Sequence, residues 1–114
     1  LNLHGATPPR PEHTAGGRLV YVGTDPVEHE IALHNGDHGI IDYLAPHCAF
    51  FTWGANYGRP DCGVPFSDRF QFVPSRQPIV MDLWSEPGSG GDTFTTIANW
   101  RQPYRTITFN GEDY

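Results

Sequence analysis

Histidine and acidic side chains crowd residues 25–47 of this chain, a composition that raises the question of a metal site. His34 and His38 are four residues apart, the spacing that places two metal ligands on one face of a helix. The dipeptide Asn35-Gly36 stands between them and favours a helix end, so the two side chains are not expected on a common face. The sequence contains no HExxH, CxxC or HxH motif. We therefore interpret these histidines as surface or capping residues and expect no metal, with a small metal-binding module as the alternative.

Asp25 is the carboxylate whose position most suggests catalysis. It follows the apolar run Leu19–Val22 and the break Gly23-Thr24, and it precedes Pro26. Asp, Pro and then Glu28 at the third following position are typical of a helix start, with Asp25 as the N-cap. Amide groups at such a terminus also attract anions. Capping and a catalytic role as a general base are both open for Asp25.

Several classes of chemistry lack the residues that they need. There is no GxGxxG after the first apolar run and no GxSxG anywhere, so the sequence predicts neither a dinucleotide cofactor nor a nucleophile-elbow hydrolase. All seven basic residues are Arg, which removes Schiff-base and P-loop lysines. The net charge of −6 disfavours nucleic acid as a partner. No apolar run has the length of a membrane span.

The elements that must position Asp25 form a strand–helix–helix–strand unit. We predict strands at Leu19–Val22 and Cys48–Trp53, and between them a helix over Val27–His34 and a second helix capped by Asp37 and ending at Leu44. Such a crossover joins parallel strands in α/β domains. Ligands bind parallel sheets where strands end. The candidate binding residues are therefore Thr24 and Asp25 after the first strand, and Gly54 and Asn56 after the second.

The rest of the chain is expected to be less regular. Residues 1–17 are predicted to be a loop or linker, and residues 18–114 a single α/β domain. Gln77–Trp84 is predicted to be a third, central strand because it is strongly apolar. The remaining expectations are a long connection over Tyr57–Val73, a loop over Ser85–Gly91, a strand or short helix over Thr93–Trp100, and a strand over Thr106–Phe109.

Asn110-Gly111 is the favoured dipeptide of a two-residue hairpin turn, and only three residues follow it. We interpret this end as a fragment boundary of a larger protein, with a complete small domain as the alternative. The two cysteines, Cys48 and Cys62, are interpreted as free thiols of a cytoplasmic protein.

Five segments carry a resemblance to a known family: YVGTDP, FFTWGANYGRPDCGVP, PSRQPIVMDLW, FTTIANW and ITFNGEDY. Their order resembles bacterial proteins described as glycosyltransferases of the two-domain GT-B type, over about Leu19 to Tyr114. The resemblance implies a partial Rossmann-like parallel sheet with flanking helices and a C-terminal hairpin strand. It places this piece on the acceptor side, while a nucleotide-sugar donor is held mainly by the other half. It points to Thr24, Asp25, Gly54 and Asn56, and more weakly to Asp82 and Trp84.

A fragment of this kind is expected to be inactive alone, because half of the cleft is missing. The alternative is a carbohydrate-binding module without catalysis, in which Trp53, Trp84 or Trp100 stacks on a sugar. Parallel pairing of the two apolar strands favours the transferase, whereas an antiparallel sandwich with a row of exposed tryptophans favours the module.

Overall fold

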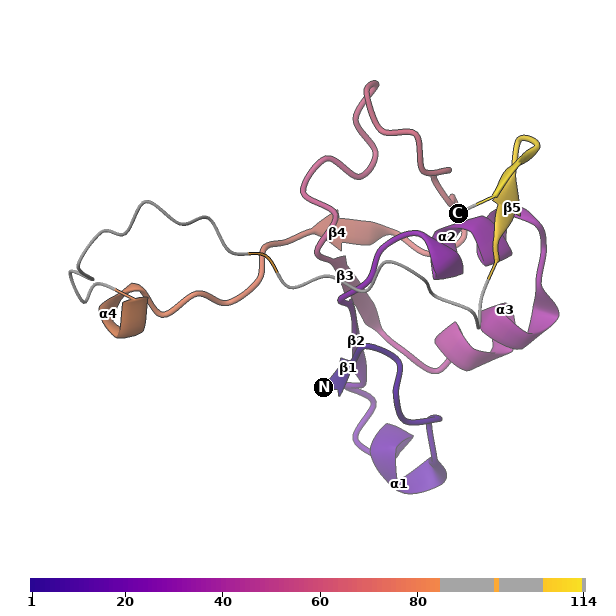
Figure 1. The fold of residues 1–114 in the computed structure, drawn as a ribbon. Coiled ribbons are helices and arrows are strands. Elements are labelled where there is room, and N and C mark those ends of the chain that lie inside the picture. Colours follow the sequence, from indigo (N-terminus) through magenta and orange to yellow (C-terminus); the bar gives the residue numbers. More distant parts are fainter. Residues whose placement is uncertain (85–95, 97–105, 114) are drawn as a thin grey trace. The chain divides into compact units, whose positions relative to one another are not determined.

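The computed structural model describes residues 1–84, 96 and 106–113. The chain divides into two compact units, Leu1–Gln77 and Pro78–Tyr114. The first unit is built on a four-stranded sheet, shown in Figure 1. Its strands are β1 (Asn2–Leu3), β2 (Val20–Gly23), β3 (Ala49–Thr52) and β4 (Phe72–Pro74), and they lie side by side in that order.

All three strand pairs of this sheet are parallel. The predicted α/β class is confirmed, and so is the parallel pairing of the two apolar runs around the crossover. Each boundary of β2 and β3 differs by one residue from that of the predicted strand. Short β-branched and aromatic runs bounded by glycine were a sufficient signal for these two strands.

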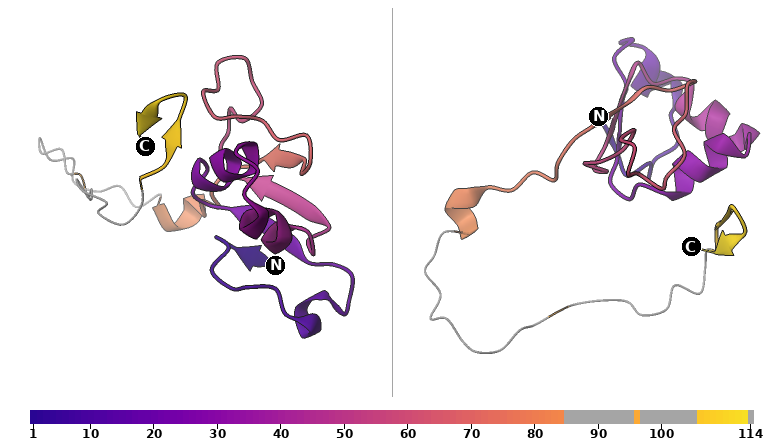
Figure 2. Two further views of the ribbon diagram at one scale, coloured as in Figure 1. Left: turned by 90° about the vertical axis from the view of Figure 1, so that its right-hand side faces the viewer. Right: turned by 90° about the horizontal axis from the view of Figure 1, so that it is seen from above.

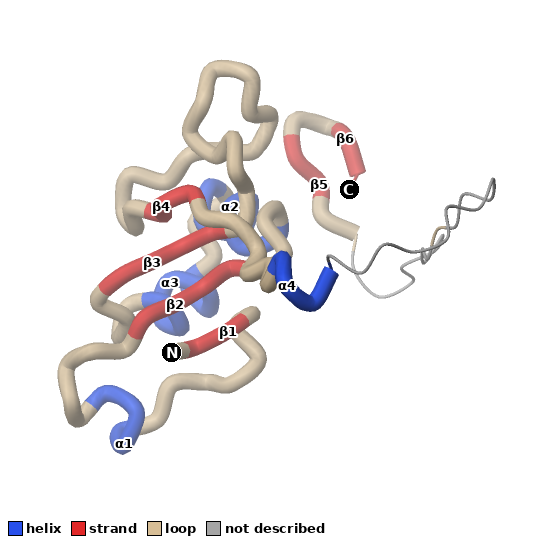
Figure 3. Tube along the Cα trace, turned by 90° about the vertical axis from the view of Figure 1, so that its left-hand side faces the viewer, coloured by secondary structure: helices blue, strands red, loops and turns tan. Residues whose placement is uncertain are grey.

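Three helices lie in the first unit: α1 (Pro11–Thr14), α2 (Glu28–His34) and α3 (His38–Leu44). Helices α2 and α3 lie in front of the strands in the left panel of Figure 2 and behind them in Figure 3, so both cover the same face of the sheet. Gly36, at φ +75°, ends α2 in the left-handed conformation that glycine adopts without strain. The Asp37 carboxylate then accepts the N–H groups of Gly39 (2.7 Å) and Ile40 (3.2 Å), as predicted for the cap of α3.

One row of side chains crosses the whole sheet beneath these helices. The register pairs Asn2 with Tyr21, Tyr21 with Phe50, and Phe50 with Phe72. The Phe50 and Phe72 ring centroids are 5.5 Å apart, and those of Tyr21 and Phe72 are 6.0 Å apart. Helix side chains complete the core: Leu33, Ile41 and Leu44 are buried against this row. Burying these apolar side chains fixes which face of the sheet the helices cover.

Three predictions for other parts of the chain differ from the structure. Residues 1–17, predicted as loop or linker, contain β1 and α1. The predicted strand Gln77–Trp84 is wrong: it contains instead the short helix α4 (Met81–Trp84), and Ile79, Val80 and Met81 are exposed. The strand that pairs with β3 is β4, which begins inside the predicted connection Tyr57–Val73 and ends one residue after it. Phe72 of β4 completes the aromatic row, whereas the run that follows Pro78 is apolar but not buried.

The second unit holds α4 and a pair of short strands, β5 (Thr108–Phe109) and β6 (Glu112–Asp113), which pair antiparallel. Asn110 and Gly111 between them have φ values of +53° and +82°. The loop predicted over Ser85–Gly91 lies outside the described residues, as does the segment predicted over Thr93–Trp100 apart from Thr96. Within the described part of the chain, no helix has the length and apolar character needed to cross a membrane.

Candidate functional site

The four parallel strands end at one common edge of the sheet, and the residues that follow them form the candidate site. The hydrogen bonding of the sheet continues one residue beyond three strands. The N–H of His4 donates to the carbonyl of Val22 (2.9 Å), that of Trp53 to Gly23 (2.9 Å) and that of Ser75 to Thr52 (2.7 Å). We call this the carboxyl edge; it is the edge where parallel α/β sheets bind ligands.

Four predicted site residues lie at the carboxyl edge. The loops after β2 and β3 meet there, because a Cβ atom on Gly54 would lie 3.4 Å from the Cβ atom of Pro26. The backbone of Gly54 thus lies next to the side chain of Pro26, which brings the two loops together. Asp25 and Asn56 are exposed and Thr24 is half-buried. The fifth predicted residue, Trp84, belongs to α4 in the second unit.

The predicted capping role of Asp25 is wrong. Helix α2 begins at Glu28, one residue after the predicted start, and its N-cap is Val27, two residues after Asp25. The carboxylate of Glu30 accepts the N–H of Val27 at 3.0 Å, as the third residue of a capping box does. Capping therefore does not explain why an aspartate stands at position 25. The carboxylate of Asp25 is exposed and lies at the carboxyl edge next to Thr24.

Two further polar groups lie near this edge that the sequence did not point to. His4 directly follows β1, and its Nδ1 is hydrogen-bonded to Oγ1 of Thr24. His4 has φ +62°, which is uncommon for a residue with a side chain. Glu30 is buried, and desolvation raises the pKa of its carboxyl group, with a further rise from the charge of Asp25. A perturbed carboxyl close to a ligand edge is a common feature of functional sites.

Beneath the edge, Tyr21 links β2 to α2. Its hydroxyl is 2.5 Å from Nδ1 of His29. Burial raises the pKa of Tyr21, so the phenol keeps its proton, and its hydroxyl group and this nitrogen share one hydrogen bond. Gly5, at φ +65°, closes the cluster: a Cβ atom there would lie 3.2 Å from both the His29 ring and the Tyr43 hydroxyl.

His47 belongs to a structural network and not to the surface as predicted. It is 6% exposed, and its Nδ1 is 3.1 Å from the carbonyl of Leu44. Its Nε2 is 3.1 Å from Nδ2 of Asn2, which is also 2.7 Å from the Tyr43 hydroxyl. Burial lowers the pKa of His47, so the neutral ring donates from Nδ1 and accepts the Asn2 amide proton at Nε2. These partners satisfy the ring and leave it a structural role.

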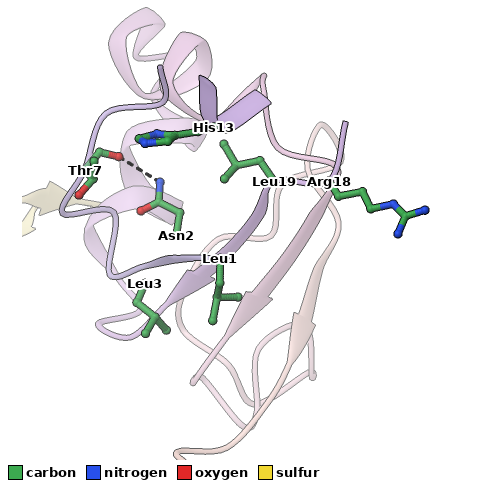
Figure 4. A pocket seen from close by; sticks show the side chains of 7 residues that line it. All are labelled: Leu1, Asn2, Leu3, Thr7, His13, Arg18 and Leu19. Carbon is green, nitrogen blue, oxygen red and sulfur yellow. Dashed lines mark hydrogen bonds between the residues drawn. The ribbon is translucent and has the colours of Figure 1, made fainter. Parts of the chain in front are cut away.

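A cavity of about 450 Å³ opens at the other end of β1 and β2. Figure 4 shows the side chains that line it, with the Asn2 amide donating to the Thr7 carbonyl at 3.2 Å and Arg18 extending away from them. Leu1 and Leu19 precede their strands, so this cavity lies at the amino ends of β1 and β2. It contains none of the predicted site residues, and the carboxyl edge remains the candidate site.

Metal chemistry finds no support in the described ranges, where no three His, Cys, Asp or Glu side chains are grouped so as to hold an ion. His34 and His38 are exposed on different helices, α2 and α3.

Comparison with known protein families, curated proteins and solved structures found no match to the chain. The predicted residues at the carboxyl edge carry a hydroxyl (Thr24), a carboxylate (Asp25) and an amide (Asn56), which are groups that form hydrogen bonds with hydroxyl groups.

Proposed function

We propose that the unit Leu1–Gln77 is the acceptor-binding part of a glycosyltransferase, built on a partial Rossmann-like sheet. The observation that carries the proposal is the all-parallel sheet whose loops after β2 and β3 meet at the carboxyl edge. This topology supports a transferase over an antiparallel carbohydrate-binding sandwich. The C-terminal hairpin strand expected for the same family, a cytoplasmic location and a second half that holds the nucleotide-sugar are parts of this proposal.

Asp25 is the proposed catalytic base. Its exposed carboxylate takes the proton of an acceptor hydroxyl while that oxygen attacks the anomeric carbon, and the nucleoside diphosphate leaves with the electrons of the broken bond. Thr24 and Asn56 hydrogen-bond neighbouring hydroxyl groups of the acceptor, and Gly54 allows its close approach. The net charge of −6 and the absence of Lys favour a role away from the donor diphosphate.

The test uses the complete reading frame that contains this sequence. The protein is supplied with a panel of nucleotide-sugars and simple glycoside acceptors, and release of nucleoside diphosphate is measured. We expect turnover, and for Asp25→Asn a fall in kcat of about 10²-fold or more with little change in the donor KM. Asp42→Asn, an exposed carboxylate on α3, is the matched control and keeps the wild-type rate. Absence of turnover with every donor overturns the function, and a wild-type rate for Asp25→Asn overturns the role of this residue.

A carbohydrate-binding module without catalysis is the second candidate. It is favoured by Trp53, which directly follows β3 at the carboxyl edge and is only half-buried. Under this alternative, saccharides bind to the complete protein and no nucleotide-sugar is consumed. The same turnover assay, combined with a saccharide titration, separates the two functions.

A further inference from the structure

The connection between β3 and β4 carries one exposed aromatic ring. Phe66 is 53% exposed, although the connection buries two other large aromatic side chains, Tyr57 and Phe70. Figure 1 shows this connection projecting from the sheet between the two strands. An exposed phenyl ring forgoes part of the stabilisation that burial gives.

The backbone around Phe66 is held from both sides by one phenol. The hydroxyl of Tyr57 donates to the carbonyl of Pro65 and accepts the N–H of Ser67, both at 3.3 Å. Tyr57 itself is 4% exposed and packs edge-on against Phe72 of β4, with centroids 5.9 Å apart. Phe66 is therefore connected through Tyr57 to the core of the sheet.

The ring of Phe66 is also held. Its centroid lies 5.4 Å from that of Tyr57, with 30° between the ring planes. It rests against the backbone of Gly58, where a Cβ atom would lie 3.2 Å and 3.3 Å from two carbons of the ring. Gly58 has φ +78°, so both its conformation and its lack of a side chain suit this contact. The ring is thus fixed in orientation while half of it faces solvent.

The surroundings of the ring indicate what binds it. Residues that lie close in sequence to Phe66 or to Gly58, among them Arg59, Asp68 and Arg69, are polar and exposed. A protein partner is recognised by a contiguous apolar patch with several large side chains, which is not what this loop presents. A pyranose ring has one apolar C–H face and a rim of hydroxyl groups, and it matches a single aromatic face bordered by charged and polar groups.

Phe66 and the residues that hold it lie close in sequence to the carboxyl edge. The N–H of Tyr57 donates to the carbonyl of Gly54 at 3.0 Å. Tyr57, whose phenol holds Phe66, therefore directly follows the edge residues Gly54 and Asn56 and is bonded to the first of them. We propose that Phe66, fixed on Tyr57 and Gly58, is a stacking platform for a pyranose ring of the acceptor. This inference rests on the proposed function and adds a saccharide class of acceptor and the residue that contacts its apolar face.

The test is a saccharide titration of the 114-residue chain, followed by NMR amide shifts, with methyl glycosides and disaccharides as probes. We expect millimolar binding by at least one probe, with shifts at Gly58 and Ser67. Phe66→Ala is expected to weaken binding about tenfold. Phe66→Leu, which keeps an apolar side chain but lacks a π face, is expected to lose most of the affinity, whereas Phe66→Trp keeps it. Val73→Ala, a change at an exposed apolar residue of β4, is the control and leaves affinity unchanged.

Amide spectra of the variants, compared with wild type away from residues 57–71, show whether the fold is kept. Equal affinity of Phe66→Ala and wild type overturns the platform, and so does the absence of binding by every probe. Binding that survives in Phe66→Leu also overturns it, because the apolar volume and not the aromatic face is then what matters. None of these results decides the proposed function, which stands or falls on nucleotide-sugar turnover by the complete protein.

Discussion

Asn2 is expected to stabilise the first unit far more than a residue in a two-residue strand usually does. Its side-chain amide is buried and lies within hydrogen-bond distance of the Tyr43 hydroxyl (2.7 Å), Nε2 of His47 (3.1 Å) and the carbonyl of Thr7 (3.2 Å). Nδ2 has two protons, so the side chain makes two hydrogen bonds shared among these three acceptors, and the carbonyl of Thr7 also accepts the Tyr43 hydroxyl (3.4 Å). The perturbation is Asn2→Ala.

The magnitude follows from what the substitution leaves behind. Two hydrogen bonds are lost, at about 1 kcal/mol each. Tyr43 is half-buried and can bind water instead, but Nε2 of His47 stays buried without a donor, which costs about 1–2 kcal/mol more. We expect the free energy of unfolding to fall by about 3–4 kcal/mol, which for a domain of this size is a fall in Tm of roughly 12–32 °C.

The assay is urea denaturation at neutral pH followed by circular dichroism. Leu3→Ala is the matched control: Leu3 is the other residue of β1, is exposed, and is expected to change the free energy of unfolding by less than about 0.5 kcal/mol. In a His47→Phe background the Asn2→Ala substitution is expected to cost about 2–3 kcal/mol less than in wild type, because both the Asn2–His47 hydrogen bond and the orphaned nitrogen are already gone. An Asn2→Ala effect no larger than that of Leu3→Ala would refute the network.

Three further outcomes concern pH and the helix ends. Burial lowers the pKa of His47 below its ordinary 6.5, so the unfolded chain takes up the proton first as pH falls. The stability that the neutral ring gives is therefore complete above about pH 6.5 and is lost as pH falls through the folded-state pKa. The difference in unfolding free energy between wild type and His47→Phe should therefore shrink with falling pH in urea melts, and a constant difference contradicts this. Gly36→Ala forces a side chain to φ +75° and should lower the free energy of unfolding by about 1 kcal/mol in thermal melts. Gly16→Ala, which has an ordinary φ and no atom within 4 Å of the new Cβ, should leave the stability almost unchanged. Equal effects of the two substitutions argue against a strained helix end. Asp37→Ala removes the cap of α3 and should lower the free energy of unfolding by about 1 kcal/mol, whereas Asp42→Ala on the same helix should leave it almost unchanged. Equal melting temperatures of the two variants contradict the capping role of Asp37.

The crossover of the fold could be predicted from the sequence because its signals are local. Gly36 and Asp37 mark the end of one helix and the start of the next through backbone conformation and side-chain capping, which depend on neighbouring residues alone. Strand β1 has no such signal: its buried member is Asn2, and its partners come from residues 43 and 47. For β4, the alternation of Phe70 and Phe72 with Gln71 is present but short, and the longer apolar run after Pro78 outweighed it.

The candidate site was predictable where it depended on correctly placed strands. Thr24 and Gly54 follow β2 and β3, and the structure brings their loops together. His4 could not be found without β1. The start of α2 was ambiguous for a chemical reason: Glu28 and Glu30 both offer a carboxylate three residues after a possible N-cap, and the structure selects the second, with Glu30 buried.

The aromatic row across the sheet has a consequence for the order of folding. Its members come from positions 2, 21, 50 and 72, so every contact in the row joins distant parts of the chain. Parallel sheets of this kind form slowly, because long loops must close before any pairing is rewarded. During synthesis at about 5–20 residues per second, Phe72 follows Phe50 by about 1–4 s. For that interval the nascent sheet presents the unpaired edge of β3 and the ring of Phe50, which makes this stretch of synthesis the period in which the chain most needs protection from aggregation.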